Sequence, residues 1–150
     1  MRRLRTRLAR LGFGLSLCAL ALGASACSSS SSHQAAPATT VRVGERDFRI
    51  TVSPARVHAG AVRLLVHNRG PDTHELLMVR SSSAALPLRS DGLTVNEAAL
   101  DSATVGVIEG REPGTGEQLL VHLKPGRYEL FCNMAGHYLG GMRAELVVVT

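Results

Sequence analysis

The chain has 150 residues, of which 17 are lysine or arginine and 12 are aspartate or glutamate, giving a formal net charge of +5. A chain of this length folds as one compact domain at most. Five arginines lie within the first ten residues, so the remainder carries 12 basic and 12 acidic residues and has no net charge. The positive balance therefore belongs to the N-terminus, and we expect no nucleic-acid partner.

The N-terminus has the three parts of a bacterial secretory signal. The arginines are followed by an apolar run over 11–22 and then by the small residues of 23–26. This apolar run is too short to span a bilayer comfortably, and its order of segments is typical of export. We therefore predict a signal peptide over 1–26 and an exported protein at the cell envelope.

Cys27 marks the predicted start of the mature chain. Ala24 and Ala26 satisfy the rule for ordinary signal cleavage, whereas Ala26 followed by Cys27 also resembles the lipobox of bacterial lipoproteins. The serines after Cys27 are typical of the tether that follows a lipidated cysteine. We expect Cys27 to carry a lipid anchor on the outer face of the cytoplasmic membrane, with simple secretion or periplasmic release as the alternative.

The rest of the chain divides into a tether and a domain. Residues 27–40 are rich in Ser and Ala, which predicts a flexible tether, and 41–150 form the folded domain. Apolar residues in this domain recur mostly with a period of two, the period of β-strands. Strands are predicted over the segments 48–52, 62–67, 74–80, 105–108, 118–123, 128–132 and 143–149.

Turn residues separate these strands, and together they favour an all-β fold. We predict a Greek-key β-sandwich or barrel of about seven to eight strands. Within 62–67, Val62, Leu64 and Val66 should face inward. The segment 81–103 departs from the pattern, because its residues 94–97 match a capping box that predicts a short helix within a long loop.

One segment combines a thiol, an imidazole and a thioether. Cys132, His137 and Met142 lie at the spacing C-x4-H-x4-M between the last two predicted strands. Soft sulfur ligands with imidazole select copper, and a Cys/His2 set with a distant Met is the arrangement of a blue-copper site. His74 supplies the second histidine at the start of a predicted strand. An inert buried thiol is the alternative for Cys132, the one cysteine of the folded part.

The remaining histidines and methionines of the domain are predicted to have structural roles only. We expect His58, His67 and His122 to lie on the surface, and Met78 and Met134 to be packing residues, with Met134 within reach of the site.

These residues and turns together resemble the cupredoxins, the family of plastocyanin, azurin and rusticyanin. The likeness spans the domain and includes the turns at 68–70 and 124–126, and the ligand loop is most similar to the rusticyanin type. It implies one copper ion that cycles between Cu(I) and Cu(II). It also implies His74, Cys132 and His137 as equatorial ligands and Met142 as the axial one.

One position departs from the family pattern. Glu75 stands where many cupredoxins carry an asparagine that braces the thiolate loop, so Thr73, Asn133 or another residue is expected to take over this role.

The resemblance implies an electron carrier and not an enzyme, because four protein ligands leave no open position for a substrate. The electron would leave through His137, past a candidate partner patch of Ala135, Tyr138 and Leu139. Its partners would be redox proteins that bind transiently, and we expect a monomer. The alternatives are a copper protein for storage, delivery or resistance, and a metal-free sandwich that acts as a binding module.

Overall fold

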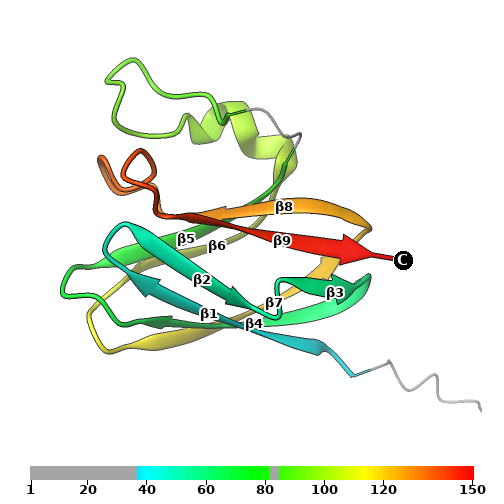
Figure 1. Cartoon of the computed structure of the whole chain (residues 1–150). Coiled ribbons are helices and arrows are strands. Elements are labelled where there is room, and N and C mark those ends of the chain that lie inside the picture. Colours follow the sequence, from blue (N-terminus) through cyan, green and yellow to red (C-terminus); the bar gives the residue numbers. More distant parts are fainter. Residues whose placement is uncertain (1–36, 82–84) are drawn as a thin grey trace, which may run out of the picture. The chain divides into compact units, whose positions relative to one another are not determined.

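The structure is a computed structural model that describes residues 37–81 and 85–150. Within these residues the chain forms one short 3-10 helix and nine strands, and the strands are arranged in two sheets (Figure 1). The predicted all-β sandwich is therefore confirmed. The predicted signal peptide, Cys27 and most of the tether lie outside the described residues. Among the described residues, no helix has the length and apolarity needed to cross a membrane.

The first sheet has four strands. In spatial order these are β2 (Arg49–Ser53), β1 (Thr39–Arg46), β4 (Gly60–Asn68) and β7 (Gly116–Leu123). β1 runs parallel to β4, and the other neighbours are antiparallel.

The second sheet has five strands and packs face to face on the first (Figure 1). In spatial order these are β3 (Arg56–His58), β9 (Arg143–Val149), β8 (Gly126–Phe131), β5 (His74–Arg80) and β6 (Thr104–Arg111). β5 and β8 lie side by side, so the start of β5 and the end of β8 meet at one end of the sandwich.

The main core lies between the sheets and follows strand alternation. On β4, Val62, Leu64 and Val66 are buried while Arg63 and His67 are exposed, as predicted. Both sheets contribute to this core, so each apolar face removes the other from water. All strands of the described region and this core fall within a compact unit, Ala35–Thr150, which therefore has the components needed to fold by itself.

β1 was not predicted, although its register with two neighbours makes it central to the first sheet. The strand begins at Thr39, inside the segment expected to be tether. Val41 and Val43 are buried, but the next inward position is Glu45, which breaks the apolar alternation. Glu45 forms a buried ion pair with Arg111 of β6. Burial raises the pKa of Glu45, and Arg111 opposes that rise.

β5 is buried on both faces. Leu76 and Met78 belong to the main core, whereas Leu77 and Val79 belong to a second core on the outer side of the five-stranded sheet. That second core is closed by residues of the segment 85–103 and of the loop before β9 (Figure 1). The segment therefore covers a sheet face that would otherwise expose apolar side chains.

The predicted helix exists as the 3-10 helix η1 (Glu97–Ala103), but the predicted capping box is wrong. Asn96 precedes the helix, and its side chain makes no cap hydrogen bond. The Thr94 hydroxyl donates instead to Asp91, and the Glu97 carboxylate accepts from Asn133. Both side chains thus serve contacts that a four-residue motif cannot reveal.

Candidate metal centre

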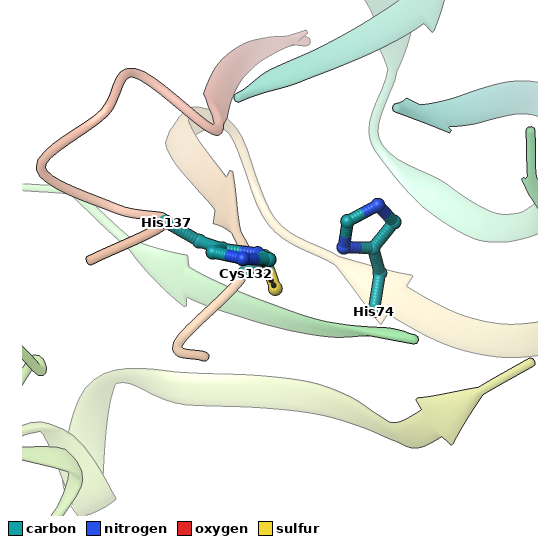
Figure 2. A group of neighbouring side chains, drawn as sticks. All are labelled: His74, Cys132 and His137. Carbon is teal, nitrogen blue, oxygen red and sulfur yellow. Dashed lines mark hydrogen bonds between the residues drawn. The ribbon is translucent and has the colours of Figure 1, made fainter. Parts of the chain in front are cut away.

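Three side chains converge at one end of the sandwich. His74 opens β5, Cys132 directly follows β8, and His137 lies in the loop between β8 and β9. One nitrogen or sulfur atom from each lies within 4.8 Å of the others, and Figure 2 shows the three side chains gathered around a common space. Cys132 Sγ lies 3.5 Å from His137 Nδ1, and the two imidazole centroids are 5.2 Å apart. The structure therefore brings together three of the four predicted ligands as a group.

His74 is fully buried, and its two nitrogens have different surroundings. Nε2 lies 3.1 Å from Oδ1 of Asp47, whereas Nδ1 is buried without a hydrogen-bond partner. Since buried polar atoms are nearly always satisfied, an unpartnered Nδ1 beside a thiol fits a metal ligand. Burial, and then the neighbouring His137, lowers the pKa of His74. This keeps the ring neutral, the form that binds metal.

Asp47 reaches His74 because the turn 68–70 leaves room for it. Gly70 is buried, and a Cβ on it would lie 2.7 Å from His74 Nε2 and 2.8 Å from Asp47 Oδ1. Asn68 holds this turn by accepting the backbone N–H of Gly70. A side chain at residue 70 would displace the carboxylate from the imidazole.

Cys132 is buried and is not part of a disulfide. Burial raises the pKa of its thiol, while the backbone N–H groups of Glu75 and Met134 donate to the sulfur and oppose that rise. Without a cation the thiol therefore stays protonated at neutral pH. A bound metal ion would stabilise the thiolate, and the two N–H groups are already placed to share its charge.

The loop that carries Cys132 and His137 is fastened to the segment 85–103. Asn133 Oδ1 accepts the N–H of Val95 at 2.6 Å, and Asn133 Nδ2 donates to Val95 O at 3.1 Å and to Glu97 Oε1 at 2.7 Å. Asn133 thus provides the bracing expected of it. Thr73 does not, because its hydroxyl donates to Glu112.

Glu75 has a bracing role that the sequence did not reveal. Its carboxylate accepts the backbone N–H of Asn133, and burial raises its pKa, with nearby Glu97 adding to the rise. Glu75 therefore contacts the ligand loop twice, through this carboxylate and through its own N–H to Cys132. The Glu75 carboxylate therefore occupies the bracing position that the resemblance assigns to asparagine.

Met142 is fully buried and belongs to the same loop. Its N–H donates to His137 O at 2.9 Å, and its carbonyl accepts the N–H of Cys132 at 3.1 Å. The backbone of Met142 therefore links the two other predicted ligands of the loop.

Comparison with solved structures finds the same architecture. Auracyanin B matches with 23% identity and a TM-score of 0.58, over 76% of this chain and 91% of its own. Auracyanin A, titled a "blue" copper protein from Chloroflexus aurantiacus, matches with 18% identity and a TM-score of 0.56, over 75% and 100%. Rusticyanin from Thiobacillus ferrooxidans matches with 14% identity and a TM-score of 0.52, over 75% and 79%. The domain has the cupredoxin fold. No family model and no curated protein matches the chain.

Tyr138 lies inside the molecule, so its predicted place in a surface patch is wrong. Tyr138 packs edge-on against Phe131 in the second core and is 4% exposed. Its hydroxyl accepts the Leu86 N–H at 3.3 Å and an Arg143 N–H at 3.0 Å. The loop folds this side chain back over the outer face of the five-stranded sheet, which a linear reading of the loop cannot show.

Exposed apolar side chains lie in the loop that carries His137 and in the β1–β2 turn beside it. In the loop, Leu139 is 53% exposed, Met134 is 39% exposed and Ala135 is also exposed. In the β1–β2 turn, Phe48 is 54% exposed. We call Phe48, Met134, Ala135 and Leu139 the apolar rim. The Phe48 ring meets His137 edge-on at 5.4 Å and lies so close to Gly140 that a Cβ there would clash with it.

Phe48 and Asp47 are the residues at this end that sequence reasoning missed. Phe48 was expected to begin a strand, but it occupies the β1–β2 turn with a φ of 57°. Recognising β1 would have placed both residues in a hairpin turn. His58, His67 and His122 are exposed and Met78 is buried in the core, as predicted, whereas Met134 is exposed and the packing role predicted for it is wrong.

Proposed function

We propose that this chain is an exported type 1 copper protein that carries single electrons between redox partners. The observation that carries the proposal is the group of His74, Cys132 and His137, with the unpartnered buried Nδ1 of His74. One thiol and two imidazoles are the donors that a mononuclear blue-copper site requires. Copper bound there would supply one-electron chemistry through Cu(I) and Cu(II).

The protein's own residues would hold the ligands rigidly. His74, Cys132 and His137 would hold the copper, with Met142 as its fourth ligand. The hydrogen bonds of Asn133 and Glu75 tie the ligand loop to neighbouring elements. A constrained loop limits rearrangement when the charge of the site changes. With four protein ligands no position remains for a substrate, so we propose a carrier and not an enzyme.

Electrons would enter and leave through His137. It is the one partly exposed residue of the three; Phe48 of the apolar rim contacts its ring, and the other rim residues lie in the same loop. Apolar residues around a redox exit favour a small contact that forms and releases quickly. Replacing His137 with alanine should abolish fast exchange with any partner, and an unchanged rate would contradict this route.

The location of the protein is proposed from the sequence of its N-terminus. A signal peptide over 1–26 would export the chain, and lipidation of Cys27 would hold the monomeric domain near membrane-bound redox enzymes. Mass analysis of Cys27 in the native host tests this part: a diacylglycerol adduct supports it, and an unmodified residue contradicts it.

Electrochemistry separates electron transfer from copper storage or delivery. The domain 35–150, loaded with copper, should give a reversible one-electron couple and fast self-exchange. Rapid loss of Cu(I) to a chelator, together with slow self-exchange, would favour storage or delivery instead.

A further inference from the structure

The outer face of the four-stranded sheet carries an unbalanced charge. Strand alternation turns the side chains of Val41 and Val43 inward and those of their neighbours outward. The exposed residues of this face and of the loop after β4 include five arginines: Arg42, Arg46, Arg49, Arg63 and Arg69. We call these five residues the arginine face.

None of these five arginines forms an ion pair within the part of the chain that the structure describes. On the other sheet, by contrast, Arg127 pairs with Glu145, and Arg143 lies 3.9 Å from Glu129. Glu117 is the acidic residue that lines the groove of the arginine face. The arginine face therefore carries a positive charge, although the domain as a whole has no net charge.

A groove crosses this face because two strands carry glycine at the same level. Gly44 of β1 and Gly116 of β7 both pair with His67 of β4, one on each side. The Thr51 hydroxyl lies over Gly44 and the His67 ring lies beside Gly116, so polar side chains form the floor of the groove between Arg42 and Arg69. Hydroxyl groups from β2 line the same groove, those of Thr51 and Ser53.

We propose that the arginine face docks an acidic segment of the redox partner, a proposal that rests on the proposed electron-transfer function. Guanidinium groups bind carboxylates through paired, directional hydrogen bonds, so free arginines beside a groove suit an Asp- or Glu-rich segment.

The position of the face supports a redox partner as the occupant. Arg46 and Arg49 form the register pair that flanks the turn carrying Phe48. Phe48 contacts His137, so the arginine face is continuous with the apolar rim. A partner seated on the rim would extend over these arginines, which would also steer its approach.

Peptide binding to the copper-free domain 35–150 tests the docking surface. The probe is a ten-residue polyglutamate peptide, followed by amide NMR shifts, with polylysine as the reference. We expect shifts over the groove and binding that weakens with salt. The double variant Arg42→Glu/Arg69→Glu should weaken binding by at least about tenfold. The control Arg56→Glu/Arg89→Glu changes two exposed arginines elsewhere and should leave binding unchanged.

The result that would overturn the proposal is equal weakening by both double variants, or shifts spread evenly over all exposed arginines. Equal binding of inorganic phosphate at matched charge would also overturn it, because it would show an unselective anion surface. The peptide measurement contains no copper, so it can succeed even where the copper proposal fails. If the copper-loaded face variant keeps the wild-type visible spectrum, weaker peptide binding cannot be attributed to a damaged metal centre.

Discussion

Asp47 and His74 meet at the edge of the candidate metal centre, with Oδ1 of the carboxylate 3.1 Å from Nε2 of the ring. The acceptor at Nε2 fixes the proton there and leaves Nδ1 unprotonated. Nδ1 is the buried nitrogen without a partner. Because Phe48 follows Asp47 in the same turn, the β1–β2 hairpin supports the site from inside and covers it from outside.

Asp47→Asn should disturb the site without removing a ligand. Loss of the negative acceptor makes His74 a weaker donor, so we expect the reduction potential to rise and copper affinity to fall by about 10- to 100-fold. In the copper-free domain, the ¹⁵N shifts of His74 should show a mixture of tautomers. Asp72→Asn is the matched control, because Asp72 acts on His74 by charge alone. Equal effects of the two variants would refute the role of the hydrogen bond.

Asn133→Ala should loosen the ligand loop. The change leaves the buried N–H and carbonyl of Val95 without their partner, which costs about 1–3 kcal/mol of folding free energy. Urea unfolding of the copper-free domain measures this cost. Asn96→Ala is the control, since the Asn96 side chain makes no cap hydrogen bond. A loss no larger than that of the control would contradict the bracing role.

Tyr138→Phe should reduce stability and leave the exposed surface unchanged. The variant removes the acceptor of the buried Leu86 N–H, and we expect a loss of about 1–3 kcal/mol in unfolding free energy. Leu139→Ala, at an exposed position of the same loop, should change stability by less than about 0.5 kcal/mol. A larger loss of stability in Leu139→Ala than in Tyr138→Phe would contradict the buried position of Tyr138.

The copper-free domain should lose stability through His74 as the pH falls. Burial lowers the folded-state pKa of His74 below 6.5, so under acidic conditions the unfolded chain takes up a proton that the folded chain does not. The stability due to neutral His74 is complete above the unfolded-state pKa and is lost as the pH falls toward the folded-state pKa. The stability difference between wild type and His74→Gln should therefore shrink from about pH 7.5 to about pH 5. With exposed His67→Gln as the reference, a constant difference would contradict the burial effect.

The sequence predicted the fold and the donor group because their signals are local. Period-two alternation identified β4 and β5, and the C-x4-H-x4-M spacing placed three donors in one loop. What it missed depends on long-range contacts. Glu45 broke the apolar alternation of β1, and its partner Arg111 lies on a distant strand that the local pattern does not show. Because β1 was not predicted, the hairpin turn with Asp47 and Phe48 was not recognised.

Tyr138 shows the same limit at the site. Its direction depends on the segment 85–103 covering the outer sheet face, a packing relationship that neither segment reveals by itself. Which side chains of such a loop are buried and which are exposed cannot be predicted without knowing the surface that the loop packs against.

The most direct test of the central claim is a titration of the demetallated domain 35–150 with Cu(II), followed by visible absorption. We predict an intense thiolate-to-copper charge-transfer band that saturates at one copper per chain and is lost in Cys132→Ser. A wild-type domain that stays colourless and binds no copper would contradict the account.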